Sequence, residues 1–283
     1  MKNQIKVIYL IGGIGNVLFQ INFGYYLQKL GFTVYYDITL LKPNSISKIL
    51  KWSDHGTLDL MKKIGLDSNI QLVTSSKINL SFLYLSKFLK KRFFNYRYMG
   101  ISTDKKDIED IKYFLGYFHT NIEISNKLID ELQELIQKYL KNNSELTNQL
   151  KIVKHSRILH YRGGDYLKDD FRSISDSFYS YIFKKNIPDY IITNDIQNAV
   201  NHLNQFSKQE IKVINTNNAL EDFILMVYAN QLIISNSTFS WWASEIGYSN
   251  KIIQPDPLFN HVEWNVETNK NRLKYSIRSS SET

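Results

Sequence analysis

Residues 6–37 read KVIYLIGGIGNVLFQINFGYYLQKLGFTVYYD, and this stretch decides the fold class. Lys6 to Ile11 is an apolar, β-branched run that ends in glycine, as is typical of a strand buried in a parallel sheet. From Asn16 to Leu30 the apolar residues recur at helical spacing, and Gly31 is placed as a C-terminal cap. Phe32 to Tyr36 then predicts a second strand. Because parallel strands are joined by right-handed crossovers, these residues predict a β-α-β unit.

The same alternation continues along the rest of the chain. Further predicted strands are 111–118, 156–160, 190–193, 212–214, 231–235 and 251–254, and further predicted helices are 125–140, 177–185, 195–205, 220–229 and 241–247. Residues 42–80 give only weak signals. The polar, turn-forming residues 141–144 indicate a domain boundary at about 141–151, so we expect domains at 1–145 and 146–283. The fold class is therefore α/β with two parallel-sheet domains.

Composition and charge limit the classes of function. The 283 residues are enough for two domains of about 140 residues each. The absence of cysteine excludes disulfides, Cys-ligated zinc and a catalytic thiol. A net charge of +8 favours an acidic partner, such as nucleic acid, an anionic membrane or a phosphorylated substrate. No targeting segment or membrane-spanning run is visible, so we expect a cytoplasmic location.

Three polar clusters follow predicted strands, where ligands bind in open α/β sheets. The first is Gly12-Gly13-Ile14-Gly15-Asn16, which indicates an anion site at a helix N-terminus, or only a tight turn. Asp37 is spaced as a ribose-binding acid in a dinucleotide fold, although Leu18 stands where that motif has its third glycine. An NAD-dependent oxidoreductase is therefore one alternative at this stage.

The second cluster is His160-Tyr161-Arg162-Gly163-Gly164-Asp165. Arg162 offers a planar fork of donors that suits a phosphate, and Asp165 is placed to orient it or a neighbouring base. His160 is either part of this site or a core histidine.

The third cluster is Ser235-Asn236-Ser237-Thr238-Phe239-Ser240-Trp241-Trp242. Its hydroxyls cap a predicted helix and are placed to bind a phosphate there, or the cluster is a capped helix with two core tryptophans. Asp222 and Asp195 lie near other strand ends, where each is a site residue or an ordinary helix-start carboxylate. No Asp-x-Asp triplet and no metal-binding His pair occur, so we expect no metal and no cofactor.

These motifs, with Phe19-Gln20 and Leu115-Gly116-Tyr117-Phe118, resemble the α-1,2-fucosyltransferases of glycosyltransferase family 11 over nearly the whole chain. The resemblance implies a GT-B fold, with two Rossmann-like domains facing across a cleft. It implies inverting, metal-independent transfer of L-fucose from GDP-β-L-fucose to the 2-hydroxyl of a galactose-like acceptor. The N-terminal domain would then take the acceptor and the C-terminal domain the GDP-sugar, with a role in surface glycan or O-antigen synthesis.

The resemblance also assigns residues to roles. It implies catalytic roles for His160, Arg162 and Asp165, with Arg162 holding the β-phosphate. The expected substrate-binding residues are Gly13, Gly15, Asn16, Gln20, Asp195, Asp222, Asn236, Ser237, Thr238 and Phe239. One departure is Gly163, which stands where the family usually has a second arginine. It leaves open another GDP-deoxysugar donor or a degenerate, non-catalytic glycan-binding relative.

Residues 82–98 interleave aromatic and basic side chains. This pattern predicts peripheral docking on an anionic membrane, which would present the site to a lipid-linked, galactose-containing oligosaccharide. The alternatives are a partly buried helix and a basic module that binds nucleic acid or glycan. We expect no nucleic-acid partner.

Overall fold

The computed structural model describes most of the chain, and its contacts divide the chain into two compact units. The described residues are 4–42, 56–75, 81–82, 85, 88, 96–100, 108–119, 122–163, 174–256, 258 and 270–276. Unit 1 comprises Met1–Leu135 with Asn265–Thr268, and unit 2 comprises Ile136–Trp264 with Asn269–Thr283. The division lies earlier in the chain than the predicted boundary between residues 145 and 146.

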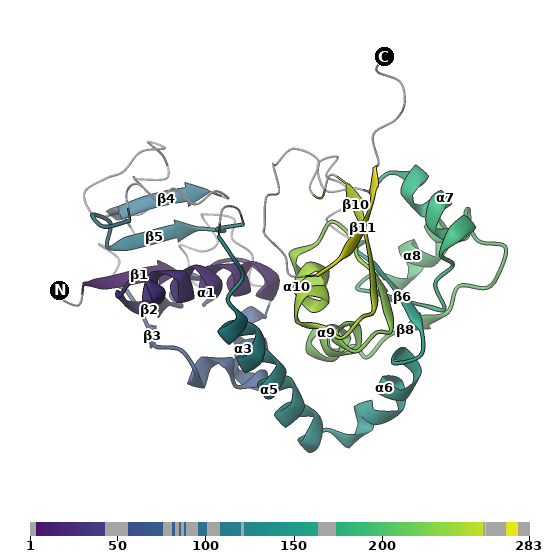
Figure 1. The fold of residues 1–283 in the computed structure, drawn as a ribbon, viewed down its shortest axis with the longest axis horizontal. Coiled ribbons are helices and arrows are strands. Elements are labelled where there is room, and N and C mark those ends of the chain that lie inside the picture. Colours follow the sequence, from purple (N-terminus) through teal and green to yellow (C-terminus); the bar gives the residue numbers. More distant parts are fainter. Residues whose placement is uncertain are drawn as a thin grey trace, which may run out of the picture. The chain divides into compact units, whose positions relative to one another are not determined.

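Unit 1 is built on a parallel five-stranded sheet with strand order β3-β2-β1-β5-β4 (Figure 1). Its strands are β1 (Ile5–Tyr9), β2 (Thr33–Asp37), β3 (Leu72–Val73), β4 (Tyr96–Gly100) and β5 (Tyr113–Gly116). Its helices include α1 (Ile14–Lys29), α3 (Thr57–Ile64) and the short 3-10 helix η1 (Leu66–Ser68). The predicted β-α-β unit is therefore present as β1, α1 and β2.

Helix α1 packs closely on the sheet because of one glycine. An added Cβ at Gly24 would lie 2.0 Å from the hydroxyl oxygen of Tyr36 on β2, so no larger residue fits there without rearrangement. Gly31, just after the helix, has a φ of +90°, the left-handed conformation that glycine adopts at helix ends. The predicted cap at Gly31 is therefore confirmed.

The aromatic and basic segment at 82–98 is described only in part. Ser81, Phe82, Leu85 and Phe88 are helical, whereas residues 96–98 belong to β4. A helix through the whole segment is therefore wrong at its C-terminal end. The basic residues Lys87, Lys90, Lys91 and Arg92 lie outside the described residues, so membrane docking stays a prediction. Within the part of the chain that the structure describes, no helix is long and apolar enough to span a bilayer.

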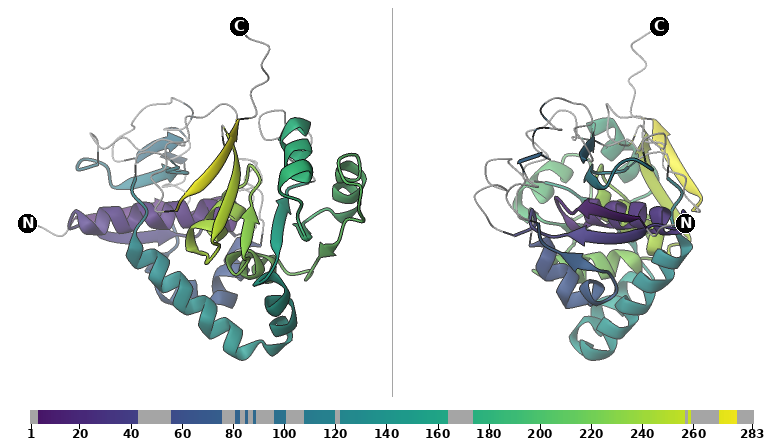
Figure 2. Two further views of the ribbon diagram at one scale, coloured as in Figure 1. Left: turned by 45° about the vertical axis from the view of Figure 1, so that its right-hand side comes forward. Right: turned by 90° about the vertical axis from the view of Figure 1, so that its left-hand side faces the viewer.

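Unit 2 contains a second parallel sheet, of six strands, in the order β11-β10-β9-β6-β7-β8 (Figure 1). The strands are β6 (Arg157–Tyr161), β7 (Tyr190–Thr193), β8 (Val213–Ile214), β9 (Gln231–Ile233), β10 (Lys251–Asp256) and β11 (Arg272–Ser276). The helices are α7 (Asp176–Lys185), α8 (Ile196–Leu203), α9 (Ala219–Val227) and α10 (Thr238–Ile246), with α7 and α8 on one face and α9 and α10 on the other (Figure 2). Before β6 come α5 (Asn126–Asn142), η2 (Ser144–Leu146) and α6 (Thr147–Val153).

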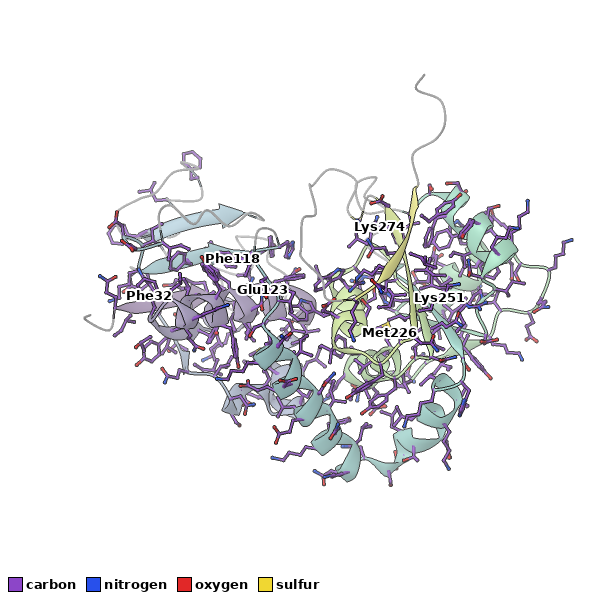
Figure 3. The ribbon with its side chains drawn as sticks, in the orientation of Figure 1. Phe32, Phe118, Glu123, Met226, Lys251 and Lys274 are labelled. Carbon is purple, nitrogen blue, oxygen red and sulfur yellow. The ribbon has the colours of Figure 1, made fainter. Side chains whose placement is uncertain are left out.

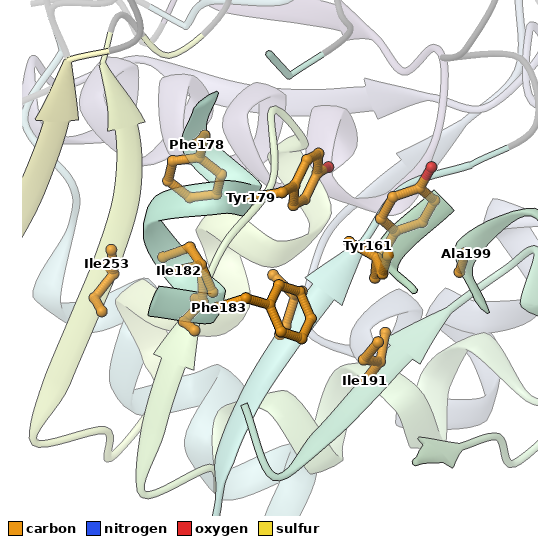
Figure 4. Packing of buried hydrophobic residues seen from close by; sticks show 11 residues of the cluster. Tyr161, Phe178, Tyr179, Ile182, Phe183, Ile191, Ala199 and Ile253 are labelled. Atoms are coloured by element: carbon orange, nitrogen blue, oxygen red, sulfur yellow. The ribbon is translucent and has the colours of Figure 1, made fainter. Parts of the chain in front are cut away.

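Strand β6 shows how the sheet separates core from site. Leu159 and Tyr161 point into the hydrophobic cluster under α7 and α8, where they meet residues such as Phe178 and Ile191 (Figure 4). Side chains alternate along a strand, so His160 points to the opposite face, where its ring lies 5.9 Å from that of Phe239 on α10. The core thus fixes the strand, and the strand end fixes the polar residues that follow it.

Candidate functional site

The polar clusters of unit 2 meet at one edge of its sheet. Strands β9, β6 and β7 are adjacent and parallel, so their carboxyl ends lie side by side. Arg162 and Gly163 follow β6, Asn194 and Asp195 follow β7, and 235–237 follow β9. Open α/β sheets bind ligands at this edge. The structure therefore brings together three clusters that lie far apart in the sequence.

The turn from β9 into α10 presents a helix N-terminus at this edge. Ser237 is the N-cap, and its hydroxyl accepts a hydrogen bond from the backbone N–H of Phe239 at 3.3 Å. Ser235, Asn236 and Ser237 are buried, while Thr238 begins the helix and is partly exposed. The first-turn N–H groups of a nine-residue helix and its dipole favour an anion here. Trp241 and Trp242 are buried in the core, so the capped-helix interpretation is confirmed, and phosphate binding stays a proposal.

His160 ties the β6 end to the β9–α10 turn. It is 4% exposed, and its Nδ1 shares a hydrogen bond of 2.8 Å with the hydroxyl of Ser235. Burial, and to a smaller extent the charge of Arg162, lowers the pKa of His160 to about 3. The imidazole is therefore neutral at physiological pH. Its geometry is that of a side chain that holds two loops together.

This buried histidine predicts a specific acid sensitivity. An unfolded chain protonates histidine near pH 6.5, whereas folded His160 stays neutral down to about pH 3. Between these two pH values the unfolded state therefore binds one proton more than the folded state. The free energy of unfolding decreases as the pH is lowered through this range, by up to about 1.4 kcal/mol per pH unit. In urea titrations between pH 6.5 and 4.5, we expect the free energy of unfolding of His160→Gln to decrease less steeply with falling pH than that of wild type. The exposed His155 provides the control His155→Gln, and equal slopes in all three proteins would contradict this account.

Gly163 is packed against Asp195. The backbone N–H of Gly163 donates to Oδ1 of Asn194 at 3.2 Å, and a Cβ added at Gly163 would lie 2.7 Å from the Cβ of Asp195. Asp195 in turn caps α8, because its carboxylate accepts from the backbone and side-chain nitrogens of Asn198 at 3.4 and 2.7 Å. A side chain at position 163 therefore requires Asp195 to move.

This packing predicts the outcome of restoring a side chain. Gly163→Ala should lower the free energy of unfolding by about 1–3 kcal/mol through overpacking, and Gly163→Arg should reduce the activity of the protein rather than raise it. Asp195→Gly removes the clashing Cβ, so the cost of Gly163→Ala should shrink in that background, as a double-mutant cycle in urea would show. A gain of activity in Gly163→Arg would instead indicate that the site lacks a charge.

Asp222 lies beyond the end of β8, in the first turn of α9. Its Oδ1 accepts hydrogen bonds from the hydroxyl of Thr216 at 2.8 Å and from the backbone N–H of Thr216 at 3.4 Å. Burial raises the pKa of Asp222, while the bonds from Thr216 act in the opposite direction. The next residue, Phe223, contacts Phe239 with ring centroids 5.2 Å apart, so α9 and α10 pack together here.

The glycine loop of unit 1 forms the N-terminus of α1. Gly13 is the N-cap, Gly15 is buried and Asn16 is partly exposed. Gly12 has a φ of +80°, and a Cβ there would lie 2.8 Å from Nδ2 of Asn16, so the turn requires glycine. Substrate binding by Gly13, Gly15 and Asn16 stays a prediction, since no described contact tests it.

Gln20 has a structural function within unit 1. Its side-chain carbonyl accepts from the N–H of Ile11 at 3.0 Å, and its amide nitrogen donates to the carbonyls of Ile11 at 3.2 Å and Gly116 at 3.0 Å. Gln20 is completely buried. The amide thus joins the carboxyl ends of β1 and β5, and a direct substrate contact stays a prediction.

The structure does not support the dinucleotide alternative. Asp37 is completely buried, and its Oδ1 accepts from the N–H of Thr39 at 2.8 Å. A ribose-binding acid must instead be open to the ligand. Asp165, the remaining predicted catalytic residue, lies outside the described residues.

With this geometry in place, the comparison with known families decides the assignment. The sequence model of glycosyl transferase family 11 matches residues 13–261. The chain belongs to glycosyltransferase family 11. The match includes residues 13–16 of the glycine loop in unit 1 and the polar residues at the ends of β6, β7 and β9 in unit 2. No curated protein shows significant similarity to the chain.

Solved structures with a similar fold are also glycosyltransferases. The crystal structure of a family 9 glycosyl transferase from Veillonella parvula DSM 2008 superposes with a TM-score of 0.50 at 10% identity, over 100% of this chain and 89% of that one. The E. coli heptosyltransferase WaaC gives a TM-score of 0.42 at 8% identity, over 96% and 93% of the chains. These identities bear on the fold alone. The superposition on the family 9 structure confirms the predicted α/β, GT-B-like fold class of this family 11 member.

The sequence did not reveal two features around these sites. Thr216, which holds Asp222, follows a strand of only two residues and belongs to no pattern. Tyr117 lies in the quoted motif Leu115-Gly116-Tyr117-Phe118 and in the predicted strand 111–118, but β5 ends at Gly116, and no sequence pattern singles out His119. Both depend on neighbours that are distant in the sequence.

Proposed function

We propose that the protein transfers L-fucose from GDP-β-L-fucose to the 2-hydroxyl of a galactose-like acceptor. The product is an α-1,2 linkage, formed with inversion and without a metal, in surface glycan or O-antigen synthesis. The observation that carries this proposal is that Arg162 and the α10 N-terminus lie at one edge of the unit 2 sheet in a family 11 chain, with Asp222 on α9, which packs against α10.

In this proposal the pyrophosphate binds at the carboxyl edge of the unit 2 sheet. Arg162 donates hydrogen bonds to the β-phosphate, and the first-turn N–H groups of α10, with Ser237 and Thr238, complete the cradle. His160 acts as a positioning residue rather than a catalytic one, because it is buried and neutral and holds Ser235.

Asp222 is proposed to recognise the guanine base. The Watson–Crick edge of guanine presents N–H donors, and a carboxylate is an acceptor of the required kind. Both described hydrogen bonds to this carboxylate come from Thr216 and reach Oδ1, so Oδ2 is the oxygen that we assign to the base. A GDP-sugar should therefore bind more tightly than the matching ADP-sugar or UDP-sugar.

The chemical step breaks the bond between C1 of fucose and the β-phosphate oxygen. Both bonding electrons leave with GDP, and the acceptor oxygen attacks C1 from the opposite face and loses its proton. Preorganised donors at the leaving phosphate stabilise the growing negative charge, by about 3–4 kcal/mol each. We assign no residue as the base.

A screen of sugar nucleotides tests this proposal. We expect GDP-fucose to be hydrolysed slowly without an acceptor and to be used for transfer to galactosides, whereas GDP-mannose should react poorly. Turnover of a different GDP-deoxysugar would favour the first alternative, a shifted donor. Binding of GDP or galactosides without any turnover would favour the second alternative, a non-catalytic glycan-binding relative. Both alternatives are considered because Gly163 stands where the family usually has an arginine. Protection from thermal unfolding by NAD but not by GDP would contradict a GDP-sugar site altogether.

The expected surroundings of the enzyme follow from the same proposal. The partners are a GDP-sugar and a galactose-containing oligosaccharide carried on a lipid, and the location is cytoplasmic, with peripheral contact to anionic membrane. The expected membrane contact rests on the basic and aromatic segment at 82–98. Flotation with anionic liposomes that is unchanged after charge reversal at Lys90, Lys91 and Arg92 would count against membrane contact.

A further inference from the structure

Phe118, just after β5 in unit 1, has an unusual backbone conformation. Its φ is +55°, in the left-handed region that bulky residues rarely enter. Such a conformation costs about 1–3 kcal/mol and persists only where the surrounding structure imposes it. The surroundings here are aromatic: the ring of Phe118 stacks on that of Phe23 of α1, with centroids 4.2 Å apart and planes 15° apart. Figure 3 shows Phe118 at the end of β5, beside α1.

The two residues that flank Phe118 form an aromatic pair. The rings of Tyr117 and His119 are stacked, with centroids 5.4 Å apart and planes 27° apart. On its other side, His119 lies 4.8 Å from the ring of Phe19 on α1. Phe118 is 1% exposed, whereas Tyr117 and His119 are partly exposed. The strained turn therefore buries the middle ring and leaves part of Tyr117 at the surface, while the His119 ring lies between Tyr117 and Phe19 with its Nε2 buried.

This pair lies beside the glycine loop of α1. The amide nitrogen of Gln20 donates to the carbonyls of both Ile11 and Gly116, so the chain just before Gly12 and the chain just before Tyr117 are held close together. Tyr117 also packs against the buried cluster that includes Tyr9 and Leu115. The pair is thus fixed at the carboxyl edge of the unit 1 sheet, where α/β folds bind ligands.

We propose that Tyr117, held in place by the ring of His119, is the platform on which unit 1 binds the sugar ring of the acceptor. A galactose-like pyranose has one face rich in C–H groups, which packs on an aromatic ring, and hydroxyls at its edge, which can bond to the phenol of Tyr117. The inference rests on the proposed function, because that function supplies the sugar acceptor. To that function the inference adds Tyr117 as an acceptor-binding residue and His119 as the ring that holds Tyr117 in place.

The test separates acceptor binding from donor chemistry. We expect Tyr117→Ala to raise the KM for a galactoside acceptor about tenfold or more, with the rate of acceptor-free GDP-fucose hydrolysis and the affinity for GDP unchanged. Tyr117→Phe should keep most of the affinity, because it keeps the ring. Tyr35→Ala is the control, since Tyr35 packs on the same buried cluster but lies on β2. It should lower the thermal midpoint without changing the acceptor KM.

Three results decide the proposal. An acceptor KM in Tyr117→Ala equal to that in Tyr35→Ala would overturn the platform while leaving the proposed function intact. If wild type turned over no GDP-sugar, the proposed function would fail, and saturation-transfer NMR with methyl β-galactoside would test the platform by itself. A signal lost in Tyr117→Ala supports it, and a signal that persists or never appears overturns it. Tyr117→Leu, which keeps bulk but removes the aromatic ring, serves if the alanine variant does not fold.

Discussion

Replacement of Arg162 by alanine is expected to lower the transfer rate at least about 100-fold. Removal of one preorganised donor from a developing anion costs about 10²- to 10³-fold in kcat, and Arg162 is the cation placed at the end of β6, beside the α10 N-terminus. Arg162→Lys should give an intermediate rate, because lysine keeps the charge but not the planar fork. The measurement is kcat with saturating GDP-fucose and acceptor, together with the thermal midpoint of each variant.

Arg157 provides a matched control on the same strand. It begins β6, and its guanidinium donates to the side chain of Gln231 at 2.8 Å and to the carbonyl of Ile187 at 2.9 Å, at the opposite end from Arg162. Arg157→Ala should lose stability but keep its turnover. If Arg162→Ala retained more than about a tenth of the wild-type rate, a loss below 1.4 kcal/mol, the role assigned to Arg162 would be wrong.

Breaking the buried ion pair between Arg272 and Glu245 is expected to destabilise unit 2 by about 3–5 kcal/mol. The two side chains are 3% and 1% exposed, with 2.8 Å between Nη2 and Oε2, and the guanidinium also lies over the ring of Trp241. Arg272→Met leaves the Glu245 carboxylate buried without its counter-ion, and Glu245→Gln leaves the guanidinium in the same position. Urea titration followed by tryptophan fluorescence would measure both losses.

The double variant Arg272→Met, Glu245→Leu should recover most of this loss, since removing both charges removes the desolvation cost as well. Lys274→Met is the control, because Lys274 is an exposed residue on the same strand, β11. If the free energy of unfolding of each single variant lay within about 1 kcal/mol of the wild-type value, solvent would have to reach the ion pair.

The sequence predicted the fold best where strands are buried on both faces. The predicted strand at 190–193 coincides with β7, and that at 156–160 differs from β6 by one residue at each end. β11 was missed because the edge strand RLKYS carries charges in place of an apolar run. Its position depends on pairing with β10 and on the contact between Arg272 and Glu245, which join distant parts of the sequence.

The residues of the candidate site, like the strands, could be predicted where the signal is local in the sequence and not where it depends on distant neighbours. Its polar clusters are local features of strand ends, so Arg162 and Ser237 could be located from the sequence. The distance between Gly163 and Asp195 depends on two neighbouring strands, and the φ of Phe118 depends on the ring of Phe23. The burial of His160 likewise follows from α10 packing on the sheet. None of these has a sequence pattern of its own.

The most direct test of a GDP-sugar site on unit 2 is isothermal titration calorimetry of GDP in the presence of EDTA. We predict a micromolar dissociation constant, about −7 to −8 kcal/mol, for wild type, and a much weaker one for Arg162→Ala and Asp222→Ala. ADP should bind more weakly than GDP in wild type and equally poorly in Asp222→Ala. Binding that requires Mg²⁺ or Mn²⁺, or an affinity for GDP that neither substitution changes, would contradict the account.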